Sequence, residues 1–165
     1  MIFQQQKKEI EMTPYETAIS GLAAALGTEL DISSDRLCDV EVDGRLILLR
    51  PMGETESAIT MFALVATVPE HGEQAAEIKT RALSMNLFGA DTLGGHLGLF
   101  VGSLVLSAPP IEAVDLDAES FAESLLAFSR FAGEVEKRLM EPVASGAEPE
   151  KGVAVPSAED GFIAV

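Results

Sequence analysis

Two neighbouring apolar runs constrain most strongly what this chain can fold into. The first is Arg45–Arg50, with the sequence Arg-Leu-Ile-Leu-Leu-Arg, and the second is Ser57–Ala66, after a short polar gap. In a strand, Leu46 and Leu48 would point to one face and the apolar residues between and after them to the other. An antiparallel strand that is wetted on one side alternates apolar with polar residues, and these runs do not. Both faces of this hairpin therefore need a cover, from the chain itself or from a partner.

The sequence around these runs predicts a three-stranded meander. Residues 37–42 alternate apolar with polar side chains, and Asp43-Gly44 is a two-residue turn in which both positions tolerate a positive φ. We expect strands at roughly 37–42, 45–50 and 58–67, with residues 51–56 forming the second turn.

Three amphipathic segments predict helices. The first begins at Thr13, which can cap it, with Pro14 at the first helical position and Glu16 completing a capping box. Helical spacing predicts two more helices, over 73–87 and from Asp115 or Asp117 to about residue 139. The apolar runs 97–101 and 103–107 predict a second hairpin about a glycine turn. The predicted helical core residues are Leu22, Leu26, Phe121, Leu125 and Phe128.

The resulting order, α-β-β-β-α-β-β-α, predicts an α+β fold with a five-stranded, mostly antiparallel, curved sheet and three helices. A length of 165 residues favours one domain. We expect a flexible arm over 1–12, the folded domain over 13–140, and a disordered acidic tail over 141–165, where Pro, Gly, Ala and Glu dominate. Whether this tail masks a binding surface is left open.

Charge and cysteine content narrow the class of partner and the compartment. A net charge of −16 argues against nucleic acid and anionic membranes, because phosphate contacts need clustered Lys and Arg. No apolar run reaches the length of a membrane span, and the first residues lack the layout of a signal peptide. The single cysteine, Cys38, fits a reducing compartment. We therefore expect a cytoplasmic protein.

No arrangement of residues in the sequence is typical of catalysis, of a metal site or of a cofactor site. His71, His96 and Cys38 stand at unrelated spacings, which makes no metal set. The segment Gly89–His96 imitates half of a phosphate loop but lacks the Lys-Ser/Thr that would contact phosphate and magnesium. Asp39 and Glu41 share a strand face, where a solvated edge explains them better than an acid/base pair. We expect no enzyme and no cofactor.

The element order and several segments resemble the class I type III secretion chaperones of the Tir-chaperone (CesT/SycE-like) family. The resemblance spans roughly 13–140 and consists of apolar and small residues without catalytic signatures. The segments that carry it are the helix Thr13–Leu26, the hairpin Val42–Arg45, the block Ala82–Phe88 with Thr92–Leu99 and Leu104–Ser107, and the helix Phe121–Leu139.

This resemblance implies a homodimeric chaperone of the bacterial cytoplasm that works without nucleotide. It would hold the N-terminal segment of a secreted effector extended and non-globular until the secretion ATPase accepts it. Two other functions remain open: a regulatory or structural subunit of the same fold that pairs with a different chaperone-like subunit, and a small-molecule-binding α+β domain.

Three helices cannot cover both faces of a five-stranded sheet, so some apolar strips should stay free. We expect these strips to bind the effector and a second subunit. The predicted effector-binding residues are Leu37, Val40, Leu46, Leu48, Phe62 and Leu64. The predicted dimer-interface residues are Ile78, Ala82, Met85, Leu97, Leu99 and Val101.

Overall fold

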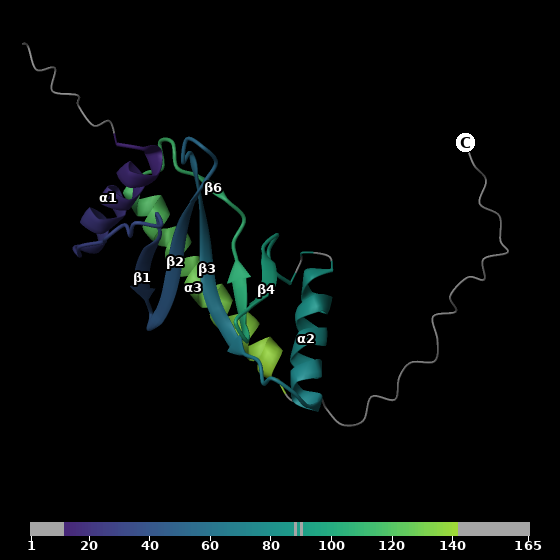
Figure 1. Ribbon diagram of the computed structural model, residues 1–165. Coiled ribbons are helices and arrows are strands. Elements are labelled where there is room, and N and C mark those ends of the chain that lie inside the picture. Colours follow the sequence, from purple (N-terminus) through teal and green to yellow (C-terminus); the bar gives the residue numbers. More distant parts are fainter. Residues whose placement is uncertain (1–11, 88, 90, 142–165) are drawn as a thin grey trace, which may run out of the picture.

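The computed structural model describes residues 12–87, 89 and 91–141, and it contains three helices and a six-stranded sheet in that part of the chain (Figure 1). The predicted arm over 1–12 and tail over 141–165 lie almost wholly outside the described residues. The elements in order are α1 (Pro14–Leu26), β1 (Cys38–Val42), β2 (Arg45–Met52), β3 (Ala58–Thr67), α2 (Glu73–Asn86), β4 (His96–Phe100), β5 (Ser103–Ser107), β6 (Ile111–Glu112) and α3 (Ala118–Met140).

The sheet has the strand order β1-β2-β3-β5-β4, with the two-residue β6 paired to the start of β3, and every pairing described is antiparallel. This confirms the predicted α+β fold and element order. Three details differ from the prediction. The strand β6 was not expected, β2 continues to Met52 because Pro51 still pairs with Ile59, and β4 already begins at His96, which pairs with Ser107.

The first hairpin turn has the backbone that its sequence predicts. Asp43 has φ +51° and Gly44 has φ +73°, so both residues lie in the left-handed region. Two such residues in a row match the right-handed twist of the flanking strands. This tight turn sets the register in which Val42 pairs with Arg45, and it therefore decides which leucines of β2 share a face.

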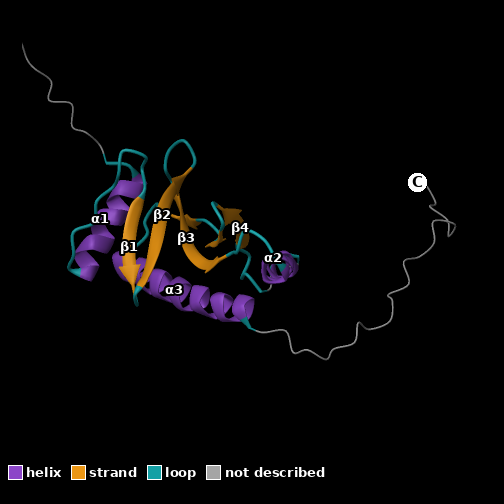
Figure 2. Cartoon of the chain, turned by 60° about the horizontal axis from the view of Figure 1, so that its bottom comes forward, coloured by secondary structure: helices purple, strands orange, loops and turns teal. Residues whose placement is uncertain are grey.

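The helices α1 and α3 cover one face of the sheet. The long helix α3 lies against β1, β2 and β3, α1 packs on α3 at the β1 end, and α2 lies beside β4 at the other end (Figures 1 and 2). Most residues that point from the sheet toward the helices are buried: Cys38, Val40, Ile47, Leu49, Met61, Ala63, Leu104 and Leu106.

The apolar stripes of the helices are largely those expected. All six stripe residues of α3, from Phe121 to Leu139, are buried, and so is the small-residue stripe of α2. In α1, Leu22 is buried, but Leu26 is 41% exposed, so its assignment to the core was wrong. Leu26 is the last residue of α1, directly before the left-handed cap Gly27.

Arg45 ties α3 to the sheet at the point where β3 is irregular. Its guanidinium donates to the Leu64 carbonyl at 2.8 Å and pairs with Glu136 of α3 at 2.6 Å. The pairing of β3 with β5 shifts register between Leu64 and Ala66. Arg45 thus satisfies a backbone acceptor at this bulge, where the regular ladder is interrupted.

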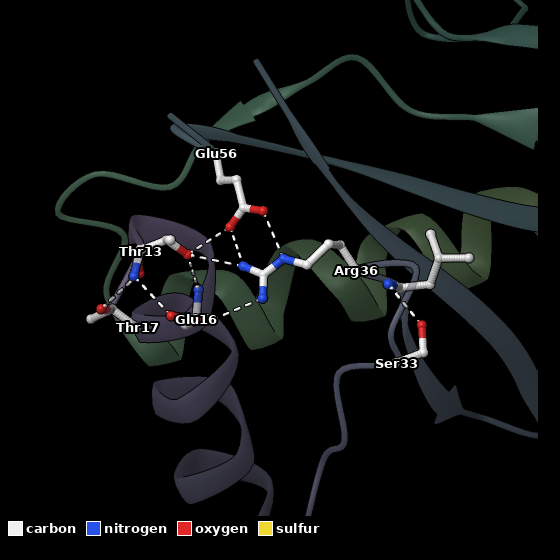
Figure 3. Close-up of polar contacts among 7 residues, drawn as sticks. Thr13, Glu16, Thr17, Ser33, Arg36 and Glu56 are labelled. Atoms are coloured by element: carbon white, nitrogen blue, oxygen red, sulfur yellow. Dashed lines mark hydrogen bonds and ion pairs between the residues drawn. The ribbon is translucent and has the colours of Figure 1, made fainter. Parts of the chain in front are cut away.

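A charged network fixes the start of α1 to the turn between β2 and β3 (Figure 3). Thr13 caps α1, since its hydroxyl accepts from the Glu16 amide at 3.2 Å while its own amide donates to the Glu16 carboxylate at 2.9 Å. Arg36 donates to Glu16 at 2.8 Å and, through two nitrogens, to Glu56. The network therefore joins three segments that are distant in the sequence.

Candidate functional site

The sheet face opposite α1 and α3 carries no helix among the described residues, and we call it the open face (Figure 2). Leu46 and Leu64 on this face are 60% and 54% exposed, and Leu48, Phe62 and Val105 are half-buried. Leu48 pairs with Phe62 across β2 and β3, and Leu64 with Val105 across β3 and β5. The open face is therefore a continuous apolar strip that crosses three strands.

Part of the open face is hollowed into a groove of about 570 Å³, here called the apolar groove. Its apolar lining comes from Leu37, Leu48, Phe62, Leu99, Phe100 and Val105. Arg50, His96 and Asp35 add charged or titratable groups at its sides. Because apolar side chains dominate, the groove suits the side chains of a bound chain better than a polar small molecule.

Five of the six predicted effector-binding residues lie on this surface. Leu46, Leu48, Phe62 and Leu64 point to the open face, and Leu37 lines the apolar groove. Val40 does not belong with them. It is 3% exposed and points toward α1 and α3, so it is a core residue and cannot contact a partner at this surface.

Two further hollows lie on the side of the molecule toward α1, and one of them shares Leu37 and Leu48 with the apolar groove. The acidic pocket, about 530 Å³, is lined by Glu29, Asp31, Ser33, Leu37, Asp39 and Leu48. The α1 groove, about 890 Å³, is lined by Met12, residues of α1 including Ile19 and Ala23, and the segment 27–32. Sequence reasoning did not find these hollows, because they are formed by a loop that packs back against α1.

A second exposed apolar surface lies at the other end of the sheet, and we call it the α2–β4 patch. It consists of Leu83, Leu87, Leu93, Leu99, Phe100 and Val101, each more than half exposed. Leu83 and Leu87 are four residues apart in the sequence, and Leu83 lies on the side of α2 away from its buried stripe. This patch adjoins the apolar groove, since Leu99 and Phe100 belong to both.

The predicted dimer-interface residues divide between this patch and the core. Leu99 and Val101 are exposed and lie in the α2–β4 patch. Ile78, Ala82, Met85 and Leu97 are buried within their own subunit, where α2 packs on β4 and α3. Their burial removes them from the surface that a second subunit could contact. The four-residue spacing of Leu83 and Leu87 in the sequence could have predicted a second apolar side of α2, opposite its buried stripe.

Asn86 fastens the end of α2 to β4. Its side-chain amide donates to the Leu97 carbonyl at 2.9 Å, and its side-chain oxygen accepts from the Leu97 amide at 2.8 Å. β4 is the last strand of the sheet on this side, so these two backbone groups of Leu97 point outward from the sheet.

The described residues offer little to covalent or metal chemistry. Burial raises the pKa of the Cys38 thiol to about 11, so the thiol stays protonated near neutral pH and is a poor nucleophile. No group of three or more metal-ligating side chains is found within residues 12–87, 89 and 91–141. In the same part of the chain, no helix is both long and apolar enough to cross a membrane.

Comparison with known proteins identifies the family. The model of the Tir chaperone protein (CesT) family matches residues 17–135, which is most of the chain, so the chain belongs to this family of chaperones. Family membership confirms the resemblance seen in the sequence and the prediction that the protein is not an enzyme. No curated protein sequence matches the chain significantly.

Solved structures of type III secretion chaperones share the fold. The ExsC–ExsE complex gives a TM-score of 0.60 at 20% identity, covering 81% of this chain and 100% of the matched chain. The HopA1–SchA chaperone–effector complex gives 0.57 at 13% identity, covering 75% and 94%. The Yersinia pestis type III secretion chaperone SycH in complex with a fragment of YscM2 gives 0.51 at 18% identity, covering 73% and 98%.

Proposed function

We propose that this protein is a type III secretion chaperone that binds the non-globular N-terminal segment of a secreted effector on its open face. The observation that carries the proposal is the apolar strip of the open face, in a chain that belongs to the Tir chaperone protein family. Similar folds have been solved in chaperone–effector complexes, which supports the same kind of client here.

The open face can hold an unfolded segment without nucleotide. Burying a side chain the size of Leu or Phe contributes about 1.5–3 kcal/mol, so a few apolar anchors offset the ordering of an extended peptide. Exposed Leu46 and Leu64 and the apolar groove offer several such contacts. Binding then keeps the client extended by mass action, in the cytoplasm, until the secretion ATPase takes it over.

The edge of the sheet offers a second kind of contact. β1 is the outermost strand on its side, and after Cys38, which forms a single bridge with Ile32, no further strand pairs with it among the described residues. An extended client could add backbone hydrogen bonds along this edge with little demand on its sequence.

We infer that the α2–β4 patch is the contact of a homodimer. Its apolar residues are exposed and lie in two neighbouring elements, α2 and β4, and in the segments that directly follow or connect them. An apolar surface of this kind favours association with a second copy. The shared residues Leu99 and Phe100 would then place the client groove next to the subunit boundary.

The client proposal is tested with purified protein and the N-terminal segments of effectors secreted by the native host. The unmodified chain should form a stable complex with one of them and protect it from protease. The double variant Leu46→Asp/Leu64→Asp should lose this complex while its thermal unfolding stays unchanged. The control Val114→Asp changes an exposed apolar residue outside the open face and should bind normally. Equal binding by both variants would overturn the proposed site.

A further inference from the structure

Gly98, in the middle of β4, is a glycine that neither the backbone nor the packing of the described residues requires. Its φ lies outside the left-handed region, so a residue with a side chain can adopt its conformation. A Cβ on Gly98 would meet nothing within 4 Å, whereas a Cβ on Gly95 would clash with the Ser107 carbonyl. Glycine weakens the interior of a strand and often marks a place where a ligand or another chain approaches closely.

Gly98 stands at the end of one row of the open face. It pairs with Val105 of β5, and Val105 pairs with Leu64 of β3. Residues that pair across an antiparallel ladder share a face of the sheet, so Gly98 continues the apolar strip formed by Leu64 and Val105. On the edge strand β4, the strip therefore ends at a position that has no side chain.

The space left by Gly98 belongs to the apolar groove. Gly98 lines this groove together with Phe62, Phe100 and Val105. Phe100 is 71% exposed and Val105 is half-buried, so a partner can still cover both. Because apolar side chains dominate the lining, an apolar side chain gains more by entering this space than a polar one.

We propose that Gly98 is a specificity-determining residue. It leaves room in the apolar groove for one large apolar side chain of the client, of the size of Leu, Met or Phe, which packs over β4 against Val105. This inference rests on the proposed function, since the occupant is the client segment. The client is favoured over a second subunit because the row from Gly98 continues through Val105 and Leu64, neither of which belongs to the α2–β4 patch.

A side chain introduced at position 98 should fill this space in proportion to its size. Gly98→Ala leaves most of the room, and Gly98→Leu takes it up. Burying one side chain the size of Leu or Phe changes a binding constant about tenfold to a hundredfold, so the loss is measurable. Ala127→Leu is the matched control, because it places a leucine at an exposed position of α3, the helix that covers the other face.

The first experiment needs no client. Isotope-labelled full-length protein is titrated with N-acetylphenylalanine amide, or with N-acetylalanine amide as the small counterpart, and the backbone amide resonances are followed by NMR. The phenylalanine compound should shift the resonances of Gly98, Val105 and Phe62 in a saturable manner, and the alanine compound should not. Gly98→Leu should abolish the shifts of Val105 and Phe62, and Ala127→Leu should retain them.

The second experiment uses an effector segment that forms the protease-resistant complex. Gly98→Leu should weaken its binding about tenfold or more, whereas Gly98→Ala and Ala127→Leu should bind nearly as the unmodified chain does. Replacing one large apolar residue of the segment by alanine should weaken binding to the unmodified chain by a similar factor. The same replacement should cause no further loss with Gly98→Leu, because the two changes remove the same contact.

Three outcomes would overturn the inference. The phenylalanine compound could cause no larger shifts than the alanine compound, which needs no variant to measure. Its shifts could survive in Gly98→Leu with thermal unfolding unchanged. Light scattering could give Gly98→Leu a different mass from the unmodified chain, which would assign the position to a subunit contact.

The two experiments separate this inference from the proposed function. An effector segment that binds Gly98→Leu as tightly as the unmodified chain overturns the inference and leaves the proposed function standing. If no effector segment binds, the proposed function fails, and the NMR titration still decides whether the space at Gly98 accepts a large apolar side chain.

Discussion

At the scale of single residues, Arg36 has the most unusual combination of backbone and charge. Its φ is +64°, a region that residues with a side chain rarely adopt, and its guanidinium is held by Glu16 and Glu56. Glu56 itself has φ +52°. A non-glycine residue in the left-handed region is strained, which costs free energy. In this protein, ion pairs and hydrogen bonds hold two such residues there. The sequence predicted the Thr13 capping box but not this network, whose members come from three segments.

Replacing Arg36 should weaken the attachment of α1 to the turn between β2 and β3. We expect Arg36→Ala to lower the free energy of unfolding by about 1 kcal/mol, since the side chain is partly solvent-exposed and its ion pairs are screened. Arg36→Lys keeps the charge but loses the forked contact with Glu56, so it should recover only part of the loss. Urea denaturation measures both variants, and equal stability of Arg36→Ala and the unmodified chain would contradict the role of the network.

The same network predicts how stability depends on pH. The hydrogen bonds from Arg36 hold the pKa of Glu56 below its usual value of 4.5, and the Thr13 amide together with Arg36 does the same for Glu16. Their stabilising effect is complete above pH 4.5 and is lost as the pH falls through the lowered folded-state pKa values.

Glu56→Gln removes one of these titrating groups. The variant should be less stable than the unmodified chain at pH 7, and the difference should shrink as the pH is lowered from 5 to 3. Urea denaturation at several pH values measures this convergence. A constant difference over that range would show that Glu56 does not contribute through its charge.

At the scale of elements, apolar spacing predicted every helix and five of the six strands. The spacing succeeds because each helix buries a stripe and the strands of the first hairpin have tight, recognisable turns. It missed β6, a two-residue strand, because two residues carry no periodicity. It also placed the start of β4 one residue too late, because His96 directly follows a glycine-rich turn. In the structure His96 already pairs with Ser107.

Substituting two glycines of this region distinguishes the effect of a steric clash from that of intrinsic strand propensity. A Cβ on Gly95 would lie 2.1 Å from the Ser107 carbonyl oxygen, whereas a Cβ on Gly98 would meet nothing within 4 Å. We therefore expect Gly95→Ala to destabilise the protein by about 1–3 kcal/mol, because the β4–β5 hairpin must shift. Gly98→Ala, in β4 itself, should stay within about 0.5 kcal/mol of the unmodified chain. Thermal unfolding of the two variants tests this contrast, and similar losses would contradict it.

At the scale of the whole molecule, sequence reasoning found the open face but not its relation to the rest of the surface. The surplus of apolar residues in β2 and β3 predicted that one sheet face would stay uncovered. Which parity is covered depends on where α1 and α3 pack, so Val40 was assigned to the wrong face. The stripe of α2 was predicted correctly, but from sequence alone it fits a second subunit as well as its own β4.

The proposed dimer makes a prediction at this scale. Light scattering at micromolar concentration should give twice the 17.5 kDa mass of one chain. Leu83→Glu/Phe100→Glu places charges in the α2–β4 patch and should yield a folded monomer, whereas the control Val114→Glu should leave the dimer intact. A 17.5 kDa species for the unmodified chain would overturn the dimer.

The double contact of Asn86 with Leu97 protects one edge of the sheet from further strand pairing. A carboxamide carries the same donor and acceptor as a peptide group, so Asn86 stands in for the next strand and ends the ladder there. An unprotected edge strand can pair with strands of other chains, and repeated pairing of this kind produces fibrils. Asn86→Ala would leave both backbone groups of Leu97 without this partner and open that edge of the sheet to further strand pairing.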